Sequence, residues 1–369
     1  MQLGRRQQVT TMGAVVVATA LSLAACSSSS SSSSPPSTSG SGAATSSSSS
    51  SAALSGTLNS SGSTFQLTFQ QEAIQSFKTV QSGMTVNYGG GGSGKGRTDL
   101  ASGVVNFAGS DSPIPAKETA NFKGKTVLYF PVVIGPITLS YNLSGVSKLQ
   151  LDPKVIAGIF QGTIKTWSDP AIKADNPGVS LPSTPITIAV RSDSSGTTQN
   201  FTEFLVKGAG SAWSLGSSST IKWPSGARAA SGNSGVAQTI KSTPGAIGYV
   251  DYSTAKASVL SYASVKNSSG SYIVPSPTSA SAAAGQVTVA PNLTFVAAWA
   301  AGATSYPITY QSWDLVYATQ PNANDAAMLK AYLGYLLGAG QKLLPQLYYA
   351  PLPANIDQQA VAQLSKISG

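Results

Sequence analysis

Residues 186–197 have the sequence Ile-Thr-Ile-Ala-Val-Arg-Ser-Asp-Ser-Ser-Gly-Thr. The alternating apolar residues of 186–190 predict a β-strand, and the apolar residues within 201–205 have the spacing of one helical face. The polar residues between them therefore predict a strand-to-helix turn with Ser195 as the N-cap. A helix start offers free backbone N–H groups, and Arg191 adds a planar fork that fits an oxyanion. An anion site and an ordinary capped helix with a surface arginine both agree with this stretch.

Strand-like and helix-like segments alternate along the rest of the chain, which predicts an α/β fold. Apolar runs predict further strands at 84–88, 103–108, 127–133, 137–141, 246–251 and 308–317. Asp152 and Asp169 are each followed by proline and predict helix starts, because Asp caps a helix and proline suits its first position. Apolar residues spaced between 329 and 337 predict a late helix that glycines end.

Three more turns repeat this pattern in whole or in part, with a polar turn at the end of a strand, at the start of a helix, or at both. Thr64 precedes a helical pattern, Ser93 follows a run of glycines after the strand at 84–88, and Asp111 follows the strand at 103–108. Open α/β sheets bind ligands at the carboxyl ends of their strands. We therefore expect these side chains to lie at one edge of the sheet.

The glycine-rich run 89–96 also has part of the spacing of a nucleotide-binding loop, at Gly89, Gly94 and Lys95. Such a loop needs Ser or Thr after its lysine to hold magnesium, and Gly96 stands there instead. This departure argues against a nucleotide site.

The composition excludes several kinds of chemistry. The chain has no histidine, which excludes Ser-His-Asp and Cys-His catalysis and histidine metal sites. Its one cysteine, Cys26, cannot form an intrachain disulfide. The net charge is +9, but charged residues make up only 9% of the chain and the lysines are scattered, which argues against nucleic acid. We interpret the positive field as mild steering of an anionic ligand.

The N-terminal residues predict a processed leader. Arg5 and Arg6 precede an apolar run that is too short to span a bilayer. Residues 23–26, Leu-Ala-Ala-Cys, resemble the bacterial lipoprotein box, which implies cleavage before Cys26 and its acylation, for example by palmitate. We therefore expect residues 1–25 to be a lipoprotein signal peptide.

A serine-rich stretch follows the lipoprotein box. It has no periodicity and almost nothing to bury, which is typical of a flexible tether. We expect residues 26–53 to combine the lipidated Cys26 with this tether and to hold the protein at the extracytoplasmic face of the cell membrane.

Several blocks together resemble the phosphate-binding protein of bacterial phosphate ABC importers. They occur in that family's order across nearly all of Leu54 to Gly369. The blocks are Gly62 to Phe65, Tyr88 to Ser93, Phe107 to Ile114, Phe130 to Gly135, Lys165 to Pro170, Arg191 to Thr197 and Thr243 to Tyr252. Two departures are Gln66, where the family often has proline, and Lys95, which adds a cation near the predicted site.

The resemblance implies a two-lobed periplasmic-binding-protein fold of type II, with a hinge and a ligand cleft between the lobes. It implies that residues 54–133 and 306–369 form the first lobe and residues 134–305 the second. It also implies the phosphate-binding residues: Thr64, Phe65, Ser93, Asp111, Arg191, Ser195, Gly196 and Thr197. Asp193 matches the residue that braces the arginine.

The resemblance implies binding of inorganic phosphate and delivery to the membrane permease of an ABC importer. Asp111 supports this ligand, because a carboxylate accepts a hydrogen bond from protonated phosphate but only repels sulfate, which has no proton. We expect a monomer that is not an enzyme and has no catalytic residue, metal, cofactor or nucleic-acid partner. A phosphate-ester hydrolase and a surface sensor or adhesin on the same fold are the alternatives.

Overall fold

The computed structural model of the chain describes residues 54–369, which form one compact unit. The predicted signal peptide, Cys26 and the predicted tether up to residue 53 lie outside the described residues. Within 54–369, no helix has the length and apolar character needed to cross a membrane.

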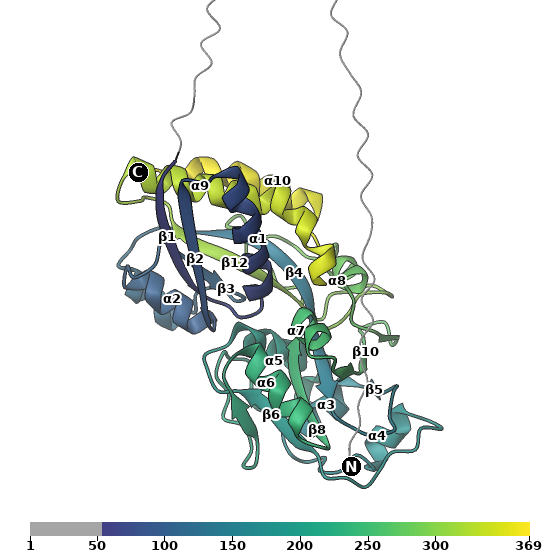
Figure 1. Cartoon of the computed structure of the whole chain (residues 1–369). Helices are drawn as coiled ribbons and strands as arrows, with labels where there is room; N and C mark the ends of the chain where they lie inside the picture. The colour runs from purple at the N-terminus through teal and green to yellow at the C-terminus, as the bar shows by residue number, and fades with distance from the viewer. Residues whose placement is uncertain (1–53) are drawn as a thin grey trace, which may run out of the picture. The chain divides into compact units, whose positions relative to one another are not determined.

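The described part of the chain alternates strands and helices (Figure 1). The strands are β1 (Gly56–Gly62), β2 (Met84–Gly91), β3 (Phe107–Ser110), β4 (Val127–Tyr141), β5 (Gln150–Leu151), β6 (Thr187–Arg191), β7 (Arg228–Ala230), β8 (Ala246–Asp251), β9 (Ser261–Tyr262), β10 (Ser264–Lys266), β11 (Tyr272–Ile273) and β12 (Thr309–Tyr317). The α-helices are α1 (Leu67–Val80), α2 (Ser93–Ala101), α3 (Pro153–Phe160), α4 (Pro170–Asp175), α5 (Gly196–Ala209), α6 (Gly232–Ser242), α7 (Tyr252–Ala257), α8 (Pro277–Ala284), α9 (Ala323–Leu337) and α10 (Ala354–Gln363). Short 3₁₀ helices are η1 (Ala116–Phe122), η2 (Gly210–Ala212), η3 (Ala339–Leu343), η4 (Pro345–Leu347) and η5 (Leu364–Lys366).

The main sheet has the strand order β2-β1-β3-β12-β4-β8-β6-β7, with β9 also paired to β4. Strands β1, β2 and β3 are parallel to one another, as are β6, β7 and β8, while β4 and β12 run antiparallel to their neighbours. A separate small sheet has the order β11-β10-β5. The α/β class predicted from the alternating pattern is therefore confirmed.

The long strand β4 joins the two halves of this sheet. Its residues 127–136 pair with β12, and its residues 137–141 pair with β8. We predicted two strands here, at 127–133 and 137–141, and this was wrong because one continuous strand tolerates both Pro131, inside the first range, and Pro136, between the two ranges. Pro131 lies at a register shift and Pro136 lies where β4 changes partner, so neither interrupts a regular ladder.

Most other predicted elements are confirmed within a few residues. Strands β2, β6, β8 and β12 and the helix starts at Asp152 and Asp169 occur where the sequence predicts them, and both aspartates accept from a backbone N–H of the first turn. The strand predicted at 103–108 begins only at Phe107, because Gly103 has a left-handed φ of 73° just after α2. Strand β1 and helix α6 were not predicted.

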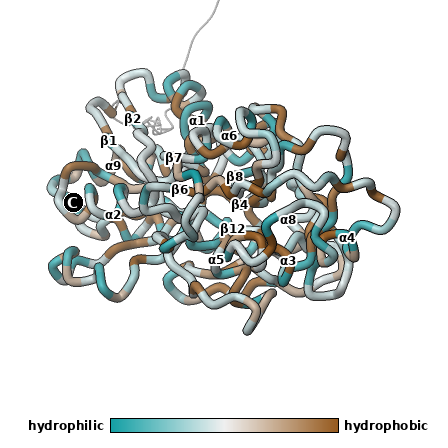
Figure 2. Tube along the Cα trace, turned by 90° about the horizontal axis from the view of Figure 1, so that it is seen from below, coloured by the Kyte–Doolittle hydropathy of each residue, from teal (hydrophilic) through white to brown (hydrophobic). Residues whose placement is uncertain are grey.

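Helices cover both halves of the sheet. Figure 1 shows α1, α9 and α10 beside β1, β2 and β12, and α3, α5 and α6 around β6 and β8. Hydrophobic residues follow β4 and β8 near the centre of the molecule (Figure 2). Phe201, Phe204 and Leu205 of α5 are fully buried, which confirms the predicted apolar face, and burial of each such side chain contributes about 2 kcal/mol. This packing fixes the helix start that follows Arg191.

Candidate functional site

The first corner of the site is the turn between β1 and α1. At Gly62 a Cβ atom would lie 2.1 Å from the backbone oxygen of Gly109, so only glycine allows this close approach. The Ser63 hydroxyl accepts from the backbone N–H of Phe65 at 3.1 Å and donates to Asp111 Oδ1 at 2.5 Å. The Phe65 N–H, which the resemblance assigns to the anion, therefore has an internal partner in this structure. Thr64 Oγ1 accepts from the backbone N–H of Asn233 at 3.3 Å.

The second corner is the start of α2. Ser93 is buried in the first turn of this helix, as predicted, and its hydroxyl accepts from the Asp111 backbone N–H at 3.1 Å. The same hydroxyl lies 3.3 Å from Asp111 Oδ2. Lys95 points elsewhere, since its ammonium group forms an ion pair with Asp99 and about half of its side chain is exposed. The cation that departs from the family pattern is thus occupied outside the site.

The third corner is Asp111, one residue beyond β3. Its carboxylate accepts from Ser312 at 2.6 Å as well as from Ser63 and Ser93. It is 1% exposed, and burial raises its pKa to about 6 although these hydroxyls and the charge of Arg191 oppose the shift. This carboxyl group therefore exchanges a proton close to neutral pH.

The fourth corner is the turn between β6 and α5, which starts with Arg191. The guanidinium group is buried and donates through Nε and Nη2 to Asp193, and through Nη1 to Thr197 Oγ1 at 3.3 Å and Asn233 Oδ1 at 3.0 Å. Burial would raise the pKa of Asp193, but the hydrogen bonds and charge of Arg191 outweigh it and lower that pKa. The placement of Asp193 as the group that holds the guanidinium agrees with the sequence expectation.

The start of α5 lies next to residues of the first half of the sheet, which contains β1, β2, β3 and β12. Ser195 is the N-cap, as predicted, and its hydroxyl accepts from the Thr198 N–H at 3.1 Å. A Cβ atom on Gly196 would lie 2.4 Å from Ser93 Oγ and 2.6 Å from the Asp111 Cβ atom. Gly196 is thus required for α5 to approach both residues so closely.

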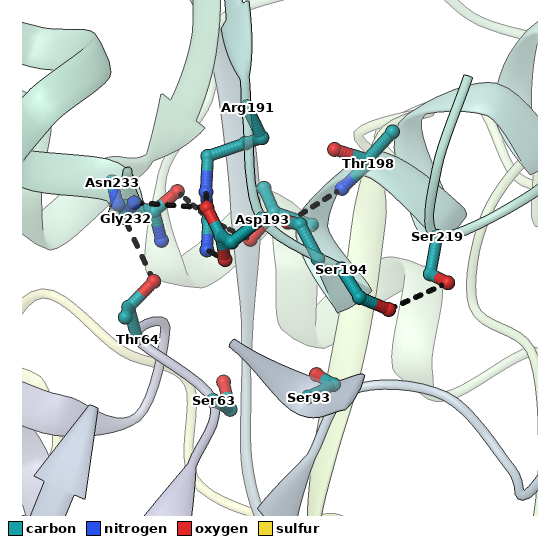
Figure 3. A network of polar contacts seen from close by, with 12 residues as sticks. Ser63, Thr64, Ser93, Arg191, Asp193, Ser194, Thr198, Ser219, Gly232 and Asn233 are labelled. Atoms are coloured by element: carbon teal, nitrogen blue, oxygen red, sulfur yellow. Dashed lines mark hydrogen bonds and ion pairs between the residues drawn. The ribbon is translucent and has the colours of Figure 1, made fainter. Parts of the chain in front are cut away.

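The hydrogen bonds and close approaches bring all of the residues predicted for the site into one region, drawn from both halves of the sheet. Figure 3 shows Thr64, Ser93, Arg191 and Asp193 of this set. Direct bonds link the halves: the Gly94 N–H donates to the Ser194 carbonyl at 3.0 Å, and Asn200 Nδ2 donates to the Asp111 carbonyl at 2.7 Å. Helices α2, α5 and α6 all begin here, so their positive ends point to one place. Free donors, one guanidinium and a titratable carboxyl suit a tetrahedral oxyanion that carries a proton.

Three polar residues of this region were missed by the sequence analysis. Ser63 and Ser312 hold the Asp111 carboxylate, and Asn233 contacts both Arg191 and Thr64. Ser312 lies in the middle of a strand, where no local pattern marks it. Asn233 had a usable signal, because Ser231-Gly232-Asn233 precedes apolar residues at helical spacing. Within residues 54–369, no cluster of carboxylates or other metal-ligating side chains could hold a metal ion.

The sequence of the chain was compared with family models and with known proteins. Residues 47–339 match the model of the PBP superfamily domain. Phosphate-binding protein PstS 3 of Mycobacterium leprae is 36% identical over 313 residues, which cover 80% of this chain and 83% of that protein. The chain belongs to the PstS family of phosphate-binding proteins. Phosphate-binding protein PstS 2 of Mycobacterium tuberculosis is 33% identical over 329 residues, covering 84% of this chain and 87% of that protein.

Solved structures with the same fold include PfluDING, described as a high affinity periplasmic phosphate-binding protein bound with phosphate. It superimposes with a TM-score of 0.70 at 23% identity, over 84% of this chain and 94% of that one. A putative phosphate ABC transporter substrate-binding protein with bound phosphate from Clostridium perfringens gives a TM-score of 0.60 at 15% identity, over 81% and 100% of the chains. The fold of this PstS-family chain is therefore the periplasmic-binding-protein fold.

Proposed function

We propose that this chain binds inorganic phosphate outside the cytoplasm and delivers it to the permease of an ABC importer. The observation that carries the proposal is the Asp111 carboxyl, buried among the hydroxyls of Ser63, Ser93 and Ser312 beside the donor cluster around Arg191. The names of the curated PstS relatives support the same ligand.

The chemistry of the cluster explains why phosphate suits it. A dehydrated anion needs a donor for each hydration contact it loses, and the starts of α2 and α5, the hydroxyls and the guanidinium provide them. Asp111 accepts from a P–OH group and repels an anion without a proton, so the site favours phosphate over sulfate. A site built around one such bond rejects the analogue that lacks it by roughly 10⁴-fold.

The proposed ligand contacts follow from the positions in the cluster. Thr64, Phe65 and Ser93 donate from the first half of the sheet, and Asp111 accepts the phosphate proton. Arg191 pairs with the anion while Asp193 holds its guanidinium, and Ser195, Gly196 and Thr197 donate from the start of α5. For the Phe65 N–H to reach the ligand, it must leave its internal bond to Ser63 Oγ.

Closure around the ligand is proposed to occur between two lobes, residues 54–133 with 306–369 and residues 134–305. The support is the change of partner along β4, which pairs with β12 before Pro136 and with β8 after it. The residues of β4 around Pro136 are proposed to act as the hinge, because a hinge needs only a few residues that absorb the change in backbone angles.

We infer that the protein acts by binding rather than by catalysis. The chain has no histidine, and the carboxyl groups of the site, Asp111 and Asp193, are held by hydroxyls and by Arg191. We also propose that the protein is a monomer and that its acylated Cys26 holds it at the outer face of the cell membrane.

Titration calorimetry with phosphate and sulfate tests the proposed ligand. We expect tight phosphate binding and sulfate binding weaker by about 10⁴-fold. Equal affinity for both anions, or no heat with phosphate, would contradict the proposal. Hydrolysis of a chromogenic phosphate ester by the purified chain would contradict the assignment as a binding protein.

The anchor has a separate test in cell fractionation. Changing the acylation site, Cys26→Ala, is expected to move the protein from the membrane fraction to the soluble fraction, because the lipid holds it there. Ser27→Ala is the matched control and is expected to leave the protein with the membrane. Retention of the Cys26→Ala variant on the membrane counts against the anchor.

A further inference from the structure

The first turn of α6 carries a buried amide that the proposed phosphate contacts do not include. Asn233 is 1% exposed, and its Oδ1 accepts from Arg191 Nη1 at 3.0 Å. Its backbone N–H donates to Thr64 Oγ1 at 3.3 Å. The side-chain Nδ2, which is also buried, has no hydrogen-bond partner among residues 54–369.

The orientation of this amide is fixed by its neighbour. If the side chain were turned over, its NH₂ group would face the donors of the Arg191 guanidinium, so the oxygen must remain on the Arg191 side. Figure 3 shows the Asn233 side chain beside the guanidinium, with its free nitrogen on the side where Thr64 and Ser63 lie. The unused donor is therefore directed into the site.

The helix that carries Asn233 begins without a side-chain cap. Ser231 is the N-cap residue of α6, but its side chain accepts no bond from the helix. The Gly232 N–H instead donates to Asp193 Oδ1 at 3.0 Å, and the Asn233 N–H donates to Thr64. The positive end of α6 therefore faces the site together with the free amide donor.

A buried donor without a partner costs free energy, so such groups are rare unless a ligand or water completes them. We propose that Asn233 Nδ2 donates a hydrogen bond to an oxygen of bound phosphate. This inference rests on the proposed phosphate function. An amide is suited to the position, because it accepts from Arg191 on one side and donates to the anion on the other.

The contact also makes Asn233 a determinant of ligand charge. Its donor adds to those that compensate the charge of the doubly charged phosphate ion. The negative charge of the Asp111 carboxylate acts in the opposite direction. An aspartate at position 233 would keep the bond to Arg191 but turn a carboxylate oxygen toward the anion. Binding by that variant would therefore weaken further as the pH rises and phosphate loses its second proton.

Two substitutions separate a direct donor from a residue that only positions Arg191. Asn233→Ala removes both side-chain bonds, while Asn233→Asp retains an acceptor for Arg191 and replaces the donor with a carboxylate oxygen. Ser234→Ala, at the exposed next position of α6, is the matched control. Each is measured as the full chain, by titration calorimetry with inorganic phosphate at about pH 6 and about pH 8.

We expect Asn233→Ala to weaken phosphate binding by about 10- to 100-fold, the usual cost of one hydrogen bond to a charged group. Asn233→Asp is expected to weaken it at least as much, and more at the higher pH, while Ser234→Ala binds like the unchanged protein. The backbone position of Arg191 and the melting temperature without ligand are expected to stay close to those of the unchanged protein.

Near-native affinity of Asn233→Asp at both pH values would overturn the inference, because it would leave Asn233 only its bond to Arg191. A crystal structure of the phosphate complex with Nδ2 more than about 3.5 Å from every phosphate oxygen would overturn it as well. If the unchanged chain binds no phosphate in the same titration, the proposed function itself fails. The titration of the unchanged chain therefore distinguishes failure of the proposed function from failure of the inference about Asn233.

Discussion

Two aspartates of the candidate site, one on each half of the sheet, have opposite environments. Among residues 54–369, the Asp111 carboxylate, which follows β3, accepts from three hydroxyl groups, and burial raises its pKa to about 6. Asp193 follows β6 and accepts from Nε and Nη2 of Arg191, which lower its pKa against the effect of burial. The same side chain is thus prepared for proton exchange on one half and for permanent charge on the other.

The difference shows how a site can bind an anion and still contain carboxylates. The charge of Asp193 is taken up by Arg191, which is held in place with Nη1 directed to Thr197 and Asn233. Within the part of the chain that the structure describes, no cation donates to the Asp111 carboxyl, so it is the group that responds to a proton on the ligand. Substitutions on the two sides should therefore change different properties, affinity on one and selectivity on the other.

The largest effect is expected on the Arg191 side. Arg191→Ala removes the guanidinium and leaves the buried Asp193 carboxylate without its cation, so the anion meets an uncompensated negative charge. We expect phosphate affinity to fall by about 1000-fold, measured by titration calorimetry.

Arg191→Lys is the control that keeps the positive charge but lacks the planar, paired N–H donors of the guanidinium group. It should recover part of the affinity, because a lysine supplies the charge but not the paired donors. Tight phosphate binding by Arg191→Ala would contradict the assignment of phosphate affinity to the Arg191 side of the site.

A smaller effect, on selectivity, is expected on the Asp111 side. Asp111→Asn replaces an acceptor-only carboxylate with an amide that can donate, so sulfate is no longer repelled. The ratio of phosphate to sulfate affinity should narrow by about 100-fold in competition calorimetry. Ser312→Ala removes one hydroxyl partner of the carboxylate and keeps its charge, and it should leave the ratio nearly unchanged. A selectivity ratio unaltered in Asp111→Asn would mean that another group excludes sulfate.

The two aspartates should also contribute to stability with opposite dependence on pH. Because its pKa is raised, folded Asp111 keeps its proton from about pH 4 to about pH 6, where the unfolded chain has lost it. The free energy of unfolding therefore falls as pH rises through this range, by roughly 3 kcal/mol from Asp111. For Asp193 the sign is reversed, since stability is lost as pH falls through its lowered pKa.

Denaturant unfolding of the phosphate-free protein at a series of pH values measures the contributions of Asp111 and Asp193 to the free energy of unfolding. Asp111→Asn should flatten the fall between about pH 4 and about pH 6, and Asp193→Asn should flatten the loss at lower pH. Asp251 and Asp314, whose pKa burial raises to about 6 and about 7, keep part of the first slope in every variant. Equal profiles for both variants would contradict the opposite assignments.

The contrast between the two halves also shows what sequence can predict. The Arg191 half was predictable because its groups lie within a few residues of one another, from the strand through Asp193 to the Ser195 cap. Helix capping and apolar spacing are local properties of the chain, and so they appear in one sequence. The same holds for Thr64, Ser93 and Asp111, each of which directly follows a strand or precedes a helix.

The surroundings of Asp111 were not predictable in this way. Ser312 reaches it from β12, two hundred residues further along the chain, and Asn200 and Gln311 donate to its carbonyl from α5 and β12. The strand order β3-β12 brings Ser312 and Gln311 to Asp111, and the approach of α5 to the first half of the sheet brings Asn200. The continuous strand β4 was missed for a related reason, since Pro131 is tolerated at a register shift against β12 and Pro136 at the point where the partner strand changes.

The smallest effect on phosphate affinity is expected at a contact between the two halves of the sheet that is not a proposed phosphate contact. A Cβ atom on Gly94 would lie 2.2 Å from Ser194 Oγ and 2.4 Å from the Ser194 Cβ atom, at the point where the Gly94 N–H donates to the Ser194 carbonyl. Gly94→Ala should therefore oppose the approach of the halves and weaken phosphate binding by about 10-fold, without changing the phosphate-to-sulfate ratio. Gly89→Ala, in the same glycine run, is the control, because its new Cβ atom would meet only the Ser60 carbonyl at 3.7 Å. A loss of selectivity in Gly94→Ala would show that this contact orients Asp111 or Arg191, and the separation of affinity from selectivity between the two halves would fail.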